Sequence, residues 1–167
     1  MKRIILLGIV TLMFSVTALH AQKYAHINTE ELIAAMPESD SAMAQIQQEA
    51  TSLEQTLEEL QVEYNNKLEQ YLADREKLSQ VIIQNKEAEL QSLQQRIQNF
   101  EASASQSIQE LRAQLFQPVL DKANKAISDV AQEKGYTYVF DSSTGVLIYM
   151  SENAIDILPD VKAKLGL

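Results

Sequence analysis

The chain has 167 residues, no cysteine, no tryptophan and a formal net charge of −9. The absence of cysteine excludes disulfide bonds, thiolate nucleophiles and cysteine-ligated metals. An acidic chain is poorly suited to following phosphate backbones unless its basic residues gather on one face, so we expect no nucleic-acid partner. The few glycines and prolines favour a mainly helical chain.

Residues 1–21 are predicted to form a signal peptide. Lys2 and Arg3 precede an uncharged, mostly apolar run from Ile4 to Leu19, and Leu19-His20-Ala21 provides a small-residue cleavage site. The alternative is an uncleaved membrane anchor, but the apolar run would span only about 24 Å of a hydrocarbon core that is roughly 30 Å thick. We therefore expect cleavage after Ala21 and export of the mature chain.

Residues 22–39 are predicted to contribute a strand and a short helix to a small body. Lys23 to Ile27 has strand character, and Thr29 to Met36 has helical character. Pro37 is expected to close this helix, because proline cannot continue a helical hydrogen-bond ladder.

Residues 40–117 are predicted to form a helical-hairpin arm. This segment is rich in Glu, Gln, Leu, Ala and Lys, all of which form helices readily. Its first apolar stripe alternates spacings of three and four, with a lapse at Lys67, and that pattern is typical of a coiled-coil seam. The stripe consists of Met43, Ile46, Ala50, Leu53, Leu57, Leu60, Tyr64, Tyr71 and Leu78.

The first stripe loses its phase after Leu78, and a new stripe begins at Leu90. This break predicts a chain reversal within residues 79–86 and antiparallel packing of two helices, each roughly 60 Å long. No glycine or proline marks the reversal, so a single uninterrupted helix is the alternative. Val81, Ile82 and Ile83 would lie at the arm tip, where they either contact a client protein or close the turn as an apolar staple.

Residues 118–167 are predicted to return the chain to the body. Pro118 is expected to interrupt and kink the second helix, and Gly135 to end it. Tyr136 to Phe140 and Val146 to Met150 have strand character and are predicted to form a hairpin, followed by a short helix capped by Asp156.

The predicted sheet is too small to be stable alone, so its strands are expected to pair with other copies of the chain. The side chains expected to build this intersubunit body are Ile27, Tyr136, Tyr138, Val139, Phe140, Val146, Ile148 and Tyr149.

The sequence does not indicate an enzyme. His26 is the one histidine beyond residue 21, and it lies within an apolar strand pattern. Neighbouring carboxylates such as Glu58 and Glu59 do not face each other on a helix, and no glycine-rich nucleotide loop is present. We expect no catalytic residue, no metal site and no cofactor-binding residue.

The order of these elements behind a signal peptide resembles the Skp/OmpH family of periplasmic chaperones over the whole mature chain. The residues that carry the resemblance are 24–28, 135–141, 145–149 and 156–161, and the glycine-led strand of the second range is the most specific part. The resemblance implies a periplasmic homotrimer with a central β body. It further implies three helical arms around a cavity that takes up unfolded outer-membrane β-barrel proteins without ATP.

The charge of the arm departs from that family. Its best-known members are basic, whereas residues 40–134 of this chain hold sixteen acidic and nine basic side chains. A lipopolysaccharide site is therefore not carried over, and peripheral membrane contact is not indicated by charge. The alternative function is a structural coiled-coil spacer or tether in the cell envelope.

Overall fold

A computed structural model describes residues 22–167, and the predicted signal peptide lies outside this part of the chain. The described residues form two compact units. Residues 22–29 and 126–166 form the body, and residues 30–125 contain the arm. The expected class, mainly α with a small β component, is confirmed. No helix in residues 22–167 is long and apolar enough to cross a membrane.

The body is built on two parallel strands that are distant in sequence. β1 (Tyr24–Ile27) pairs with β2 (Tyr138–Asp141), so that Tyr24 lies opposite Tyr138 and His26 opposite Phe140. A later segment lies on the other edge of β1: the His26 N–H donates to the Ile155 carbonyl at 2.8 Å, and the His26 carbonyl accepts from Ile157 N–H at 3.0 Å. The N-terminal strand is therefore bonded on both edges.

The predicted hairpin is wrong. Residues 146–150 form no strand, and β2 pairs with β1 instead of with the segment that follows it. The turn after β2 is fixed by Asp141, whose carboxylate accepts from the Ser143 N–H at 2.9 Å and from the Thr29 hydroxyl at 2.7 Å. Ser142 N–H donates to the Ile27 carbonyl at 2.9 Å, which continues the parallel ladder by one residue.

The Asp141 carboxylate is held in its charged form. Burial alone would raise the pKa of Asp141, but hydrogen bonds from Thr29 and Ser143 outweigh burial and lower the pKa below its ordinary value. These bonds join β2 to the residue at which α2 (Thr29–Ala34) begins.

The C-terminal helix α5 (Leu158–Leu165) starts next to β1. Leu158 N–H donates to the Asp156 carboxylate at 2.9 Å, and Gly166, with a φ of 77°, ends the helix. Ile157 and Val161 are completely buried, and together with Ile27 they belong to the hydrophobic core.

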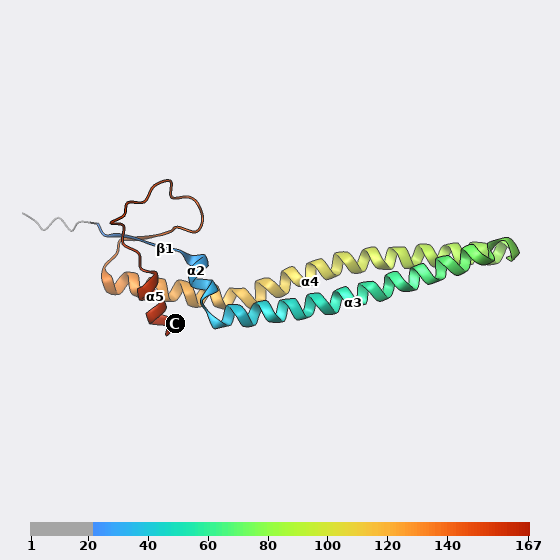
Figure 1. The fold of residues 1–167 in the computed structure, drawn as a ribbon, viewed down its shortest axis with the longest axis horizontal. Coiled ribbons are helices and arrows are strands. Elements are labelled where there is room, and N and C mark those ends of the chain that lie inside the picture. Colours follow the sequence, from blue (N-terminus) through green and yellow to red (C-terminus); the bar gives the residue numbers. More distant parts are fainter. Residues whose placement is uncertain (1–21) are drawn as a thin grey trace, which may run out of the picture. The chain divides into compact units, whose positions relative to one another are not determined.

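In the arm, α3 (Pro37–Asp74) lies side by side with the antiparallel helix α4 (Gln80–Lys134), whose residues from Ala126 onward belong to the body (Figure 1). The two helices are joined by a single 3-10 turn, η1 (Arg75–Lys77), and two further residues. The reversal thus spans residues 75–79 and overlaps the expected range of 79–86 only at its start. Neither glycine nor proline marks it, and Leu78 leaves the helix through an extended backbone conformation.

Both prolines of the long helices behave differently from the prediction. α2 ends at Ala34, and Pro37 begins α3 rather than closing the preceding helix. The first turn of a helix has no partner for its N–H groups, so the missing N–H of proline costs nothing there. Pro118 lies inside α4 without ending it, so the helix continues past the missing N–H of the proline.

The seam between α3 and α4 is closed at its two ends. Ala42, Ile46, Val119 and Ala123 are buried near the start of α3, and Tyr71, Leu90 and Leu93 are buried near the reversal. Met43 was expected in the seam but is 62% exposed, because the buried stripe of α3 begins with Ala42 and Ile46. Between these ends the seam residues are only half-buried.

Candidate functional site

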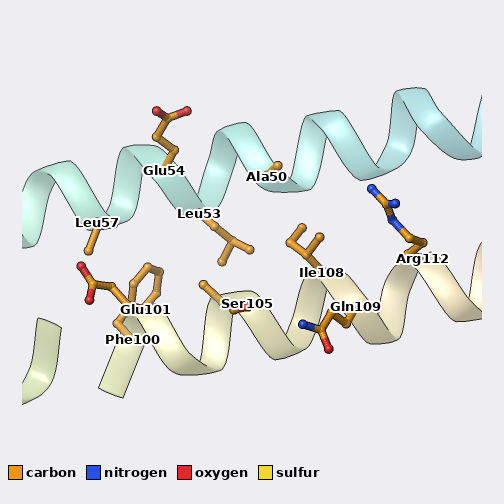
Figure 2. Close-up of a pocket in the computed structure, with 11 residues that line it drawn as sticks. Ala50, Leu53, Glu54, Leu57, Phe100, Glu101, Ser105, Ile108, Gln109 and Arg112 are labelled. Atoms are coloured by element: carbon orange, nitrogen blue, oxygen red, sulfur yellow. The ribbon is translucent and has the colours of Figure 1, made fainter. Parts of the chain in front are cut away.

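An open apolar groove lies between α3 and α4 in the middle of the arm. Its cavity volume is about 560 Å³. Figure 2 shows Leu53 and Leu57 of α3 pointing toward α4, and Phe100 and Ile108 of α4 pointing toward α3. Small side chains share the lining, namely Ala50, Ala104 and Ser105. At the helix separation found here, these small side chains leave part of the space between α3 and α4 unfilled.

Three charged side chains line this groove. Glu54 of α3 points away from α4 in Figure 2, and the other two stand at the ends of the groove. Arg112 reaches from α4 toward α3 at one end, and Glu101 lines the other end (Figure 2). The two positions are eleven residues apart on one helix, which corresponds to about 16 Å. Within residues 22–167, the Arg112 guanidinium has no hydrogen-bond or ion-pair partner.

Polar contacts clamp the arm beyond the groove on the side of the reversal. Lys67 of α3 pairs with Glu89 of α4, and Glu63 of α3 pairs with Arg96 of α4. The hydrogen bond between Lys67 and Glu89 raises the pKa of Lys67 and lowers that of Glu89. The lapse of the apolar pattern at Lys67 is therefore a position where the two helices are joined by charge.

The buried Tyr71 completes this clamp. Its hydroxyl donates to the Glu87 carboxylate of α4 at 2.5 Å, and this bond raises the pKa of Tyr71. The Arg75 guanidinium lies over the Tyr71 ring at 5.9 Å from the centroid. On the other side of the groove, Lys122 of α4 pairs with Glu38 of α3. The groove is thus the loose middle of a hairpin that is fastened at both ends.

The predicted tip residues lie in the first turn of α4, directly after the reversal. Val81 is 66% exposed and Ile82 is also exposed, whereas Ile83 is half-buried. Leu72, in the last turn of α3, is exposed as well. Exposure of Val81 and Ile82 does not fit a staple that closes the turn, while the half-buried Ile83 does. Contact of these residues with a client stays a prediction.

An exposed aromatic face covers one side of the two-stranded sheet. Tyr24, Tyr138 and Phe140 stack with centroid separations of 6.0 to 6.3 Å. Tyr138 is 57% exposed, and the other two rings are also exposed. Tyr138 and Phe140 share a face, in keeping with the alternation of side chains along a strand. Tyr24 was missed, although its alternation with the buried Ala25 and Ile27 could have identified it.

The other residues predicted to build the body differ in burial and in position. Ile27 is buried, Val139 is half-buried, and Tyr136 lies before β2, where its N–H donates to the Ala131 carbonyl. Val146, Ile148 and Tyr149 lie in the irregular segment after β2 and are exposed, with Ile148 fully so. The structure therefore brings some of these residues together in one sheet and leaves others uncovered in the single chain.

The backbone N–H and carbonyl of His26 are hydrogen-bonded to the segment 155–157. His26 is half-buried, and its Nδ1 atom is buried without a hydrogen-bond partner among the described residues. It borders a hollow of about 360 Å³ that is otherwise lined mostly by apolar and aromatic side chains. Residues 22–167 contain no group of three or more His, Cys, Asp or Glu side chains placed to hold a metal ion.

Comparison with known proteins identifies the family. The sequence model of the family described as "Outer membrane protein (OmpH-like)" matches residues 23–165. Chaperone protein Skp from Vibrio cholerae is 26% identical over 128 residues, which cover 74% of this chain and 73% of that protein. An OmpH-like protein of known structure from Caulobacter crescentus, described as an outer membrane chaperone, is similar with a TM-score of 0.73.

That structural match covers 90% of this chain and 88% of the other at 14% identity, so it shows the same fold. The resemblance to the Skp/OmpH family expected from the sequence is confirmed. Since the family model spans nearly all described residues, the chain belongs to the OmpH-like family of outer membrane proteins.

Proposed function

We propose that the mature chain is a periplasmic holdase chaperone that binds unfolded outer-membrane β-barrel proteins and prevents their aggregation without ATP. The observation that carries the proposal is the arm, which leaves apolar surface open in its middle and at its tip instead of burying it. A purely structural two-helix spacer would gain stability by closing this seam. The similarity to Chaperone protein Skp supports the same function.

The contacts offered by the arm suit a client without fixed structure. The groove and the exposed tip residues are small apolar surfaces, separated along a long hairpin and surrounded by polar side chains. Each such contact is weak, but several contacts on one client raise the apparent affinity through avidity. Release of the client then needs no ATP hydrolysis, because each weak contact can dissociate separately.

We further propose that the chain works as a homotrimer whose body is formed by the exposed aromatic face and the segment 146–150. Tyr24, Tyr138 and Phe140 present stacked rings on a sheet of only two strands, which is too small to be stable unaided. The apolar segment 146–150 lacks a strand partner within the described chain. Other copies of the chain would cover both surfaces and hold several arms around one client.

The direct test is an aggregation assay. A barrel protein unfolded in urea is diluted into buffer with increasing amounts of the mature chain, and turbidity is recorded without nucleotide. We expect turbidity to fall to the baseline at a few copies of the chain per client. The same barrel protein folded in detergent serves as the control and should not bind. Undiminished turbidity, together with tight binding to one folded envelope protein, would overturn the proposal in favour of a tether.

A further inference from the structure

We propose that the mid-arm groove between α3 and α4 is itself a binding site for an extended client segment that carries an acidic residue, a central apolar side chain and a basic residue. The inference rests on the proposed holdase function and adds a defined subsite within each single arm. It differs from uptake into a cavity between arms, because every lining residue belongs to one hairpin.

The apolar part of the ligand follows from the lining. Leu53, Leu57, Phe100 and Ile108 point into the groove from the two helices and are only half-buried (Figure 2). A cavity volume of about 560 Å³ admits a large aromatic or aliphatic side chain. Placing such a side chain there removes apolar surface from water on both partners.

The charged side chains at the two ends of the groove favour a polypeptide that carries one acidic and one basic residue. Arg112 lies at one end of the groove and has no partner in residues 22–167, so it is free to receive a carboxylate. Glu101 at the opposite end would repel a second anion and attract a cation. In an extended chain that rises roughly 3.3 Å per residue, the first and fifth residues lie about 13 Å apart, and their flexible charged side chains can reach groups about 16 Å apart. A fatty acyl chain with one anionic head group would offer no cation to pair with Glu101.

The fastened ends preserve the groove when it is empty. The pairs Lys67–Glu89 and Lys122–Glu38 hold the helices on either side of it. Filling the groove from within should therefore compete with the ligand while improving the packing of the arm.

The test uses a peptide whose binding can be seen directly, because the chain contains no tryptophan. The probe is acetyl-Asp-Ser-Trp-Ser-Lys-amide, in which alternation places the charged and aromatic side chains on one face. The matched probe replaces Asp by Asn and Lys by Gln. Tryptophan fluorescence is titrated with the mature protein, and protection of a denatured barrel protein is measured in parallel.

We expect Arg112→Gln to lower the affinity for the charged probe about three- to five-fold, as for the loss of an exposed ion pair. Its affinity for the neutral probe should be unchanged. Ala104→Leu should lower the affinity for both probes at least about ten-fold, because the larger side chain fills the groove. The same filling should raise the unfolding temperature of the arm. Lys77→Gln is the matched control, because Lys77 is an exposed cation of the reversal that does not line the groove.

Unchanged probe affinity in both Arg112→Gln and Ala104→Leu would overturn the subsite, even if the client stays protected and the holdase function stands. An equal loss of affinity in Lys77→Gln would also overturn the subsite, because the effect would then come from the net charge of the arm. Failure of the unmodified protein to keep the denatured barrel protein soluble would instead refute the proposed holdase function.

Discussion

The exposed ring of Tyr138 allows the proposed assembly to be tested quantitatively. Tyr138 is 57% exposed in the single chain, which leaves roughly 100 Å² of the 150–250 Å² that a buried aromatic side chain covers. At about 25 cal/mol per Å², covering this area stabilises the assembly by about 2.5 kcal/mol per chain. Tyr138→Ala should forfeit most of that amount, about 2 kcal/mol in each copy.

Over three copies the loss is about 6 kcal/mol, or roughly four powers of ten in the association constant. The midpoint concentration of a three-body equilibrium varies as the square root of that constant, so it should rise about a hundred-fold. Sedimentation velocity over a dilution series measures this midpoint. Leu72→Ala, which removes an exposed apolar side chain from the arm, is the control and should leave the midpoint unchanged.

An unshifted midpoint in Tyr138→Ala would refute the reasoning, because the aromatic face would then not be covered by other copies. Circular dichroism of the variant separates this effect from damage to the body, since Tyr138 also stacks on neighbouring rings.

Three further outcomes are expected. Tyr71→Phe removes the hydroxyl that donates to Glu87 and should lower the free energy of unfolding by about 1 kcal/mol, measured by urea denaturation; an unchanged midpoint would show that the clamp is not closed in solution. Because hydrogen bonds lower the pKa of Asp141, its contribution to stability is present above the unfolded value of about 3.9 and is lost as the pH falls through the folded value. Asp141→Asn should therefore destabilise the body at pH 7 and differ less from the unmodified protein at pH 3, as thermal unfolding across this range can establish. Val81→Ser combined with Ile82→Ser should raise the concentration needed to protect a client about three-fold, and equal protection would remove the tip from the binding surface.

The arm could be predicted because its helices follow from the spacing of apolar residues that are close together in sequence. Spacings of three and four place Ile46, Leu53 and Leu57 on one face of a helix, whatever the rest of the chain does. The position of the reversal could not be predicted as well, because the break at residues 75–79 is a short 3-10 turn of ordinary residues. The pattern also could not show that the seam opens around Ala104, since that depends on which side chains face each other across two helices.

The body was predicted less well because its pairing is not local. Strand alternation alone places Tyr138 and Phe140 on one face, and their rings stack there. Their partner is β1, more than a hundred residues earlier, and no local pattern indicates a parallel pairing over that distance. The turn residues after Phe140 suggested a hairpin, but the Asp141 carboxylate uses that turn to bind Thr29.

The most direct test of the account is the mass of the mature protein by light scattering, alone and after a urea-denatured barrel protein has been diluted into it. The account predicts a mass of three chains alone, and a soluble complex of three chains and one client after mixing. A monomer or dimer that leaves the client to precipitate would contradict it.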